Sequence, residues 1–192
     1  MASYSGSVAA SADDADEGTS GTVDITGGAM TLTAANQYFG FRFQGVGIPA
    51  GSTIDAATID VYLLSGSFDD PNLDIYGEDV DDAAGFSASS YNISGRALTT
   101  AVTGWSATGI GTGVKTSPDF KGVVQEIVDR AGWNSGQDMV IIMAGKAGSA
   151  FRVRTYDAGG GSYGTLKVTY TEPSGGAIVP LVVHHFRQQG IG

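Results

Sequence analysis

The fold is decided by residues 117–170, which read SPDFKGVVQEIVDRAGWNSGQDMVIIMAGKAGSAFRVRTYDAGGGSYGTLKVTY. The first part of this stretch predicts a helix, because its apolar residues recur at the spacing of one helix face. Ser117 is expected to cap the helix, Pro118 to take its first position and Gly132 to end it. The apolar face consists of Phe120, Val123, Val124, Ile127 and Val128. One helix of about four turns in a strand-rich chain should lie across a sheet or close one end of a sandwich.

Three strands are predicted after the helix. Residues 139–143 (MVIIM) are apolar on both faces, as in a central strand. Residues 151–155 and 166–170 alternate between apolar and polar side chains, as in strands with one buried face. This whole stretch therefore reads as core, and candidate functional residues are sought outside it.

Short strands are also predicted before the helix. Residues 38–43 (YFGFRF) alternate so that Phe39, Phe41 and Phe43 share one face. The same alternation recurs in residues 58–64, 73–75 and 98–102, and shorter apolar runs occupy 23–25 and 29–33. Glycine- and proline-containing turns separate these runs. The pattern predicts an all-β fold, a two-sheet antiparallel β-sandwich of the jelly-roll type with one inserted α-helix.

The chain divides into three parts by composition. Residues 1–20 are small, polar and acidic, and are predicted to form an N-terminal arm or a first edge strand. Residues 21–171 carry the sandwich. Residues 172–192 form a linker (EPSGG) and an apolar C-terminal tail (AIVPLVVHHFRQQGIG).

Charge is distributed unevenly along the chain. Up to residue 95 there is one basic residue, Arg42, and there are fourteen acidic ones; the remainder has nine basic and six acidic residues. One interpretation is a solvated acidic surface. The other is contact between copies, in which the acidic part of one chain meets the basic part of the next. Free DNA or RNA is not expected as a partner, because no row of basic residues is present to neutralise phosphates.

Several protein classes are disfavoured by what the sequence lacks. No apolar run is long enough to span a bilayer, so no membrane partner is predicted. The chain contains no cysteine, which leaves no disulfide and no thiolate chemistry. The first residues have neither a positive region nor an apolar run, so we expect a protein made in the cytoplasm without a signal peptide.

Three segments together resemble a known family. They are residues 41–63 (FRFQGVGIPAGSTIDAATIDVYL), residues 117–145, which contain QEIV, then GW, then an apolar strand, and residues 154–170 (RTYDAGGGSYGTLKVTY). They resemble the carbohydrate-binding-module-like jelly-roll domains of large bacterial surface proteins, the DNRLRE type, over about residues 11–171. Similar domains occur in structural proteins of tailed-phage particles. The resemblance implies the sandwich fold independently of the periodicity.

The resemblance also guides the functional prediction. Unlike secreted members, this chain shows no signal peptide, stands alone and ends in an apolar tail. These features favour a non-enzymatic structural or adhesion protein of a phage particle, either a capsid decoration protein or a head- or tail-fibre subunit. Its expected partners are copies of itself, with a trimer favoured on a capsid, and the major capsid or tail protein. It would then be located in the virion. The alternative is a carbohydrate-binding module for cell-surface or receptor glycans.

The C-terminal tail is the first candidate interaction site. Its apolar residues need a cover, and Pro180 favours an extended form. We expect the tail to bind a neighbouring subunit, for example by adding a strand to an exposed sheet edge; the alternative is that it docks on its own domain. The predicted subunit-contact residues are Ile178, Val179, Leu181, Val182, Val183, His184, His185, Phe186 and Arg187.

Tyrosines on outward strand positions are the second candidate, because aromatic faces stack on sugars. The candidates are Tyr38, Tyr62, Tyr76 and Tyr156. The alternative is that these side chains cover the second sheet face or pack under the helix.

Catalytic and metal chemistry are poorly supported. His184 and His185 are adjacent, so in a strand they face opposite sides and do not easily share one metal ion. The carboxylates of residues 69–82 read as exposed loops rather than as a glycosidase pair. No cofactor, catalytic residue or metal site is predicted. Calcium stays open as an alternative, because five loop carboxylates offer oxygen ligands: Asp69, Asp70, Asp79, Asp81 and Asp82.

Overall fold

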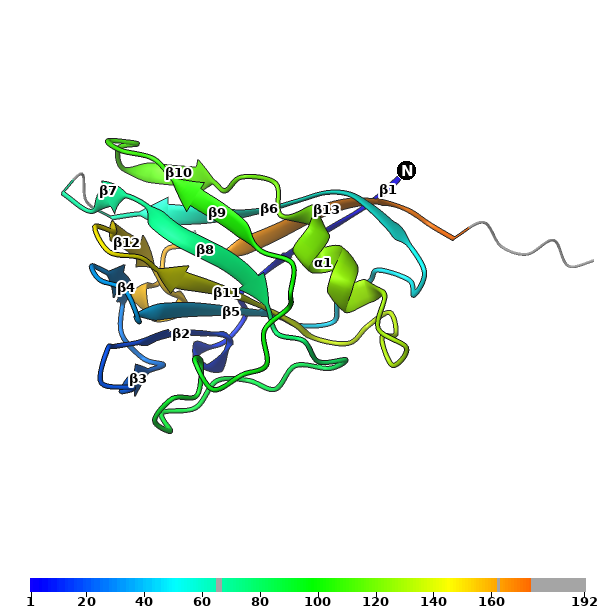
Figure 1. Cartoon of the computed structure of the whole chain (residues 1–192), viewed down its shortest axis with the longest axis horizontal. Coiled ribbons are helices and arrows are strands. Elements are labelled where there is room, and N and C mark those ends of the chain that lie inside the picture. The colour runs from blue at the N-terminus through cyan, green and yellow to red at the C-terminus, as the bar shows by residue number, and fades with distance from the viewer. Residues whose placement is uncertain (65–66, 162, 174–192) are drawn as a thin grey trace, which may run out of the picture.

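The computed structural model describes residues 1–64, 67–161 and 163–173. Two antiparallel sheets pack face to face, and the α-helix of the described residues, α1 (Lys121–Val128), lies beside them (Figure 1). This confirms the predicted two-sheet β-sandwich with one inserted helix. The tail residues proposed as subunit contacts, 178–187, lie outside the described part of the chain.

The sheets, here called A and B, have seven and six strands. Sheet A runs in the order β1 (Ala2–Ser7), β13 (Thr165–Thr171), β6 (Thr53–Leu63), β12 (Ala150–Arg154) and β4 (Ala29–Leu32), with β10 (Gly113–Thr116) beside β6 and β7 (Asp69–Asp70) beside β12. Sheet B runs β3 (Val23–Asp24), β2 (Asp14–Glu17), β5 (Tyr38–Phe43), β11 (Met139–Gly145), β8 (Asn72–Gly77) and β9 (Thr103–Ser106). The chain crosses repeatedly between the sheets, so strands distant in sequence become neighbours.

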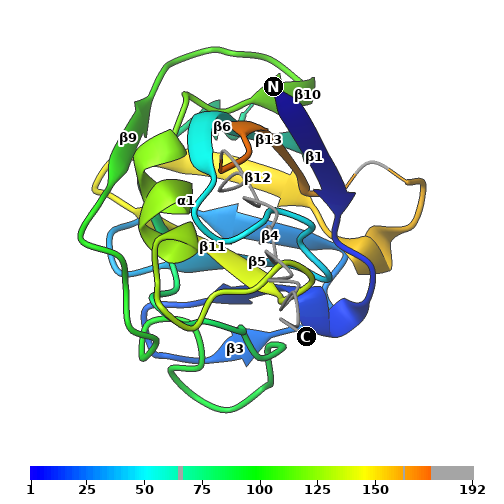
Figure 2. The same ribbon diagram turned by 90° about the vertical axis from the view of Figure 1, so that its right-hand side faces the viewer.

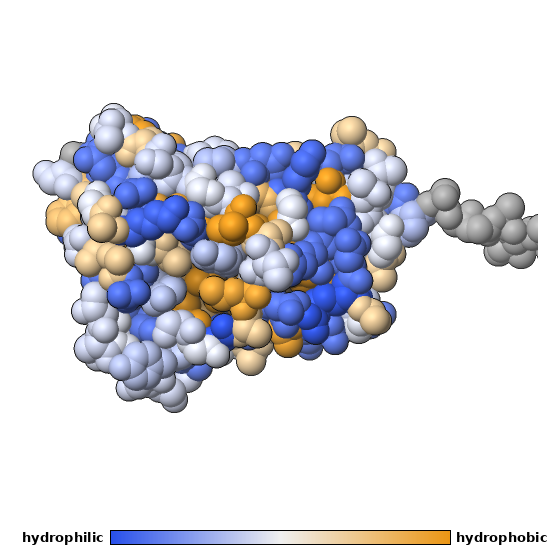
Figure 3. All heavy atoms as spheres, in the orientation of Figure 1, coloured by the Kyte–Doolittle hydropathy of each residue, from blue (hydrophilic) through white to orange (hydrophobic). Residues whose placement is uncertain are grey.

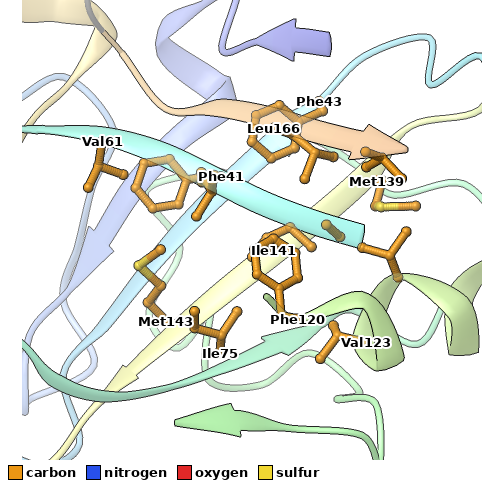
Figure 4. Packing of buried hydrophobic residues seen from close by; sticks show 14 of the residues in the cluster. Phe41, Phe43, Val61, Ile75, Phe120, Val123, Met139, Ile141, Met143 and Leu166 are labelled. Carbon is orange, nitrogen blue, oxygen red and sulfur yellow. The ribbon is translucent and has the colours of Figure 1, made fainter. Parts of the chain in front are cut away.

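The main core lies between the two sheets. Phe39, Phe41 and Phe43 of β5 are fully buried, as their alternation predicts, and each contributes about 1.5–3 kcal/mol by burial. Residues 139–143 of β11 are buried on both faces, as expected for a central strand. Figure 4 shows side chains from sheet A, such as Leu166, meeting those of sheet B and of the helix region.

The helix is shorter than the sequence predicts. The backbone N–H of Ser117 donates to the Ile59 carbonyl oxygen at 3.0 Å, and that of Phe120 donates to the Ala57 carbonyl oxygen at 2.9 Å. These bonds hold residues 117–120 along β6, so α1 begins only at Lys121, and Ser117 does not cap it.

Residues 117–128, here called the α1 region, cover part of the edge of β6. Three backbone amides of β6 donate to its side chains: Ile54 to Gln125 Oε1 at 2.7 Å, Ala57 to Asp119 Oδ1 at 3.0 Å, and Ile59 to Ser117 Oγ at 3.1 Å. These amides would otherwise be unpaired at a sheet edge, where exposed backbone groups invite another strand. The α1 region therefore closes this side of sheet A.

A long loop, residues 78–102, covers the outer face of sheet B. Its apolar side chains, including Phe86 and Ile93, pack on Val140 of β11 in a second buried cluster. The Phe86 ring lies directly on Gly40, where an added Cβ would stand 2.3 Å from the Phe86 Cζ atom. The strand predicted at residues 98–102 is part of this loop; Leu98 makes one isolated bridge and β9 starts at Thr103.

Arg96 holds this loop in place. Its guanidinium pairs with the Glu78 carboxylate at 2.5 Å and donates to the carbonyl oxygens of Ala84 and Gly85 at 2.9 and 3.1 Å. It also lies over the Phe86 ring, 4.4 Å from the ring centre. The outer face of sheet B is consequently occupied by the chain itself.

Residues 1–20 contain β1, the short 3-10 helix η1 (Ser11–Asp13) and β2. The sequence predicts either an acidic arm or a first edge strand for this segment. Three of the four carboxylates in residues 13–17 are buried. Asp13 pairs with Arg42 at 2.8 Å, and Glu17 accepts the backbone N–H groups of Ile93 and Ser94 at 2.9 Å each. These partners explain how an acidic run fits inside the sandwich.

Candidate functional site

The free edge of β1 is the first exposed feature of sheet A. All six residues of β1 pair with β13 on one side, from Ala2 opposite Tyr170 to Ser7 opposite Thr165, and no other described strand pairs with β1 on the other side. Figure 2 shows β1 at one margin of the sandwich, with β13 and β6 between β1 and α1. The strand reads ASYSGS, without a charge or a proline that would discourage pairing.

The outer face of sheet A next to β1 carries small hydroxyl side chains. Ser7 and Thr165, opposite each other on β1 and β13, are hydrogen-bonded through their hydroxyls at 2.8 Å. A shallow trough of about 310 Å³ crosses three strands of this face. Six of the residues that line it are Ser3 and Ser5 of β1, Lys167 and Thr169 of β13, and Ala56 and Thr58 of β6. No loop of the described residues covers this trough in the way that residues 78–102 cover sheet B.

A second, smaller hollow of about 130 Å³ lies on the same sheet near β10. It is lined by Tyr62 and Asp60 of β6, by Val114 of β10, and by Tyr163 and Thr165. The Asp60 carboxylate accepts hydrogen bonds from Lys167 Nζ at 2.5 Å and from Thr116 Oγ1 at 2.7 Å. Burial raises the pKa of Asp60, but these two hydrogen bonds outweigh it, so the net pKa is lowered. The hollow thus combines two aromatic rings with a charged pair.

The four tyrosines predicted as a sugar platform do not share one surface. Tyr38 lies on β5 and packs against the second buried cluster, and Tyr76 lies on β8 of the same sheet B. Tyr62 belongs to sheet A, where the Arg154 guanidinium lies 4.1 Å from its ring centre. Tyr156 contacts Tyr163, with ring centres 5.2 Å apart.

The structure therefore brings Tyr62 near the Tyr156–Tyr163 pair and separates both from Tyr38 and Tyr76. Tyr163 is a lining residue that the sequence did not single out, since it follows a glycine run and belongs to no alternating pattern. The exposed residue Val114 was also missed, because the short strand β10 has no apolar period.

The loop carboxylates considered for calcium are engaged within the chain. Asp69 and Asp70 accept the N–H groups of Gly111 and Gly109 at 2.8 and 2.6 Å. Asp79 and Asp81 both pair with Arg130, and Asp82 accepts the N–H of Asp138 at 2.8 Å. Among residues 1–64, 67–161 and 163–173, no group of three or more histidine, cysteine, aspartate or glutamate side chains is arranged to hold a metal ion.

Two carboxylates of β2 have strongly raised pKa values. Burial raises the pKa of Asp14 to about 7, although the hydrogen bond from the Tyr156 N–H lowers it. Burial likewise raises the pKa of Asp16 to about 6. Paired carboxyls with separated pKa values are typical of acid–base catalysis, but Asp14 is only 1% exposed and lines neither the trough nor the hollow of sheet A. The Asp14 carboxylate accepts the Tyr156 N–H within the chain at 2.7 Å.

A third depression, of about 270 Å³, lies in the loop over sheet B. It is lined by Glu78, Tyr91, Asn92 and Arg96, among others. Tyr91 is 57% exposed and has a positive φ of 60°, which is uncommon for a residue other than glycine. Its N–H donates to the Gly21 carbonyl oxygen at 2.8 Å, and its ring lies against Gly21. Because Arg96 is already engaged by Glu78 and by carbonyl oxygens, this depression offers no free charge to a ligand.

No family model matches this chain, and a search of curated proteins finds no match. The family resemblance therefore remains a prediction. Within the described residues, no helix has the length and apolar character needed to cross a membrane. On the face of the molecule in Figure 3, the surface over α1 is mainly hydrophilic, and hydrophobic side chains show between hydrophilic ones nearer the middle.

Proposed function

We propose that this protein is a non-enzymatic structural subunit that binds copies of itself and neighbouring proteins of a phage particle through sheet A. The observation that carries the proposal is the contrast between the two sheets. The chain covers the outer face of sheet B with residues 78–102 and part of the β6 edge with the α1 region. No described strand pairs with the outer edge of β1, and no described loop covers the trough beside it.

The proposal of a non-enzymatic role is supported by the ion pairs and hydrogen bonds that buried and partly buried carboxylates make within the chain. Asp13, Glu17 and Glu78 are engaged with partners inside the chain, and Asp14, which has the most raised pKa, accepts the Tyr156 N–H. The phage particle as the setting rests on the sequence resemblance. Within it, decoration of a capsid and a head- or tail-fibre subunit are both consistent with an open sheet.

Two measurements test this proposal. Sedimentation of the purified chain should give a mass above that of one copy, and particles assembled with the chain should retain it after purification. The proposal is contradicted if the chain is monomeric at all concentrations and absent from purified particles. Particles assembled without the chain are the control for the second measurement.

Glycan binding at the hollow of Tyr62 and Tyr163 is a second candidate. Two aromatic rings beside the Asp60–Lys167 pair offer a stacking surface and hydrogen-bonding groups, which is the combination that sugars require. Binding on a glycan array should fall at least tenfold for Tyr62→Ala and for Tyr163→Ala. Tyr76→Ala, on the other sheet, is the matched control and should bind like the parent. An array without signal for the parent chain excludes this candidate.

A further inference from the structure

We propose that the segment Ile178–Val183 (IVPLVV) of a second copy of this chain pairs as a strand with the open edge of β1. The inference rests on the proposed assembly function and names the contact through which assembly occurs. In a closed ring of copies, each chain would give its tail to one neighbour and receive the tail of another on its own β1.

The edge of β1 is suited to receive a strand. Natural sheets protect their edges with charges, prolines, bulges or covering segments. In the same sheet, the α1 region protects the β6 edge by accepting the N–H groups of Ile54, Ala57 and Ile59. β1 is six residues long, pairs without a break along β13, and contains neither a charge nor a proline. A strand of equal length would satisfy its free backbone groups.

The inner side of β1 also leaves apolar surface to be covered. Ala2 and Tyr4 are only partly buried, and both pack against the margin of the main core. Alternate apolar side chains of an added strand would cover them and extend the core by one strand. On the outer side of β1, Ser3 and Ser5 are exposed, so the remaining side chains of that strand would stand beside small hydroxyl side chains.

The tail matches this edge in composition and in length. Residues 178–183 are β-branched or aliphatic apart from Pro180, and six residues match the six of β1. Proline is tolerated in an edge strand when its missing N–H would face outward. The described chain ends at Pro173, shortly after β13, the strand that lies beside β1. The tail therefore starts close to the beginning of its own β1.

A second copy is favoured over the same chain by strand direction. β13 runs antiparallel to β1, so the chain's own tail would have to cross the start of β1 and return parallel to it. All strand pairs of the described residues are antiparallel, and a parallel ladder is slightly less stable per residue. The tail of another copy can approach β1 in the antiparallel direction without this crossing.

Single cysteines test the contact on the full chain, because the parent contains none. One preparation carries Ser5→Cys in β1, and the other carries one cysteine at position 178, 179, 181, 182 or 183. After the two preparations are mixed, re-equilibrated and mildly oxidised, a covalent dimer of unlike chains should form. Its yield should alternate with tail position, because successive strand residues face opposite sides. Thr58→Cys, in place of Ser5→Cys, is the matched control. Ser5, Lys167 and Thr58 lie opposite one another on β1, β13 and β6, so Thr58 is two strands, about 10 Å, from Ser5 and further from the proposed contact.

The outcomes separate this inference from the proposed function. The contact is supported if covalent dimers of unlike chains form with Ser5→Cys, if their yield alternates with the position of the tail cysteine, and if they do not form when Thr58→Cys replaces Ser5→Cys. A chain that sediments as an oligomer but gives no such dimers has another interface, which overturns the inference and leaves assembly standing. Cross-links only within one chain, seen when Ser5→Cys and a tail cysteine are combined, would show that the tail docks on its own body and would also overturn it. A chain that is monomeric throughout contradicts the proposed function itself.

Discussion

Replacing Asp14 with asparagine should stabilise the protein at pH 8 and reduce the dependence of its stability on pH. Asp14 is buried on β2, and one of its carboxylate oxygens accepts the Tyr156 N–H at 2.7 Å. Asparagine keeps an oxygen acceptor for that bond but carries no charge. The charged form of Asp14 is disfavoured by burial and by the neighbouring carboxylates Asp157, Asp13 and Asp16.

The sign follows from the raised pKa. Burial lifts the pKa of Asp14 from 3.8 to about 7 in the folded protein, so the folded state holds its proton more tightly than the unfolded state. The contribution of Asp14 to stability is therefore fully present below about pH 4 and is lost as the pH rises towards 7. Each pKa unit corresponds to about 1.4 kcal/mol, so the loss above pH 7 is on the order of 2–4 kcal/mol. Asp16, whose pKa burial raises to about 6, adds a smaller loss of the same sign that Asp14→Asn leaves in place.

The assay is urea unfolding followed by tryptophan fluorescence between pH 4.5 and 8.5, because Trp105 and Trp133 are both buried. Asp24→Asn is a control of opposite sign. Hydrogen bonds from Thr26 and Gly27 lower the pKa of Asp24, so its removal should reduce stability at pH 8. If Asp14→Asn has the parent's stability at pH 8 and the parent's slope between pH 5 and 7, the assignment of this pH dependence to Asp14 is wrong.

Three further predictions concern the loop, the β6 edge and the tail. Gly40→Ala should displace the Phe86 ring and destabilise the protein by about 1–3 kcal/mol, with faster proteolysis within residues 78–102; unchanged cleavage would show that the loop does not depend on this contact. Ser117→Ala should leave the buried Ile59 N–H without its side-chain acceptor and lower the free energy of unfolding by about 1–3 kcal/mol, whereas a neutral result would mean that this acceptor does not stabilise the edge. Deleting residues 177–192 should reduce the sedimenting mass to that of one copy while the melting transition of the body stays where it is. A large drop in melting temperature would instead place the tail within the fold.

The sandwich could be predicted because its core strands carry local signals. The alternation around Phe39, Phe41 and Phe43 and the apolar run at residues 139–143 need no knowledge of distant residues to be interpreted. The predicted length of the helix was wrong for the opposite reason. Ser117 and Asp119 have the chemistry of a helix start, but β6 uses them as hydrogen-bond acceptors, and that use depends on a contact across some sixty residues of sequence.

The candidate surface was only partly predictable. The tail and Tyr62 were singled out from the sequence, but the sequence does not reveal that residues 78–102 cover sheet B, because that cover depends on contacts such as Phe86 on Gly40. Nor does the sequence reveal the strand order of sheet A. Among the described residues, β1 is an edge strand because only β13, from the other end of the described chain, pairs with it, and on one side.

Hydrogen exchange of the β1 amides, residues 2–7, tests the central claim most directly. The full chain is measured at concentrations below and above its assembly midpoint, and exchange of the β11 amides, which are already paired on both sides, is the internal reference. If sheet A assembles through its open edge, the outward-facing amides of β1 should become protected as the oligomer forms, while those of β11 do not change. If the oligomer forms and β1 exchanges as fast as in the monomer, the interface lies elsewhere and the account is contradicted.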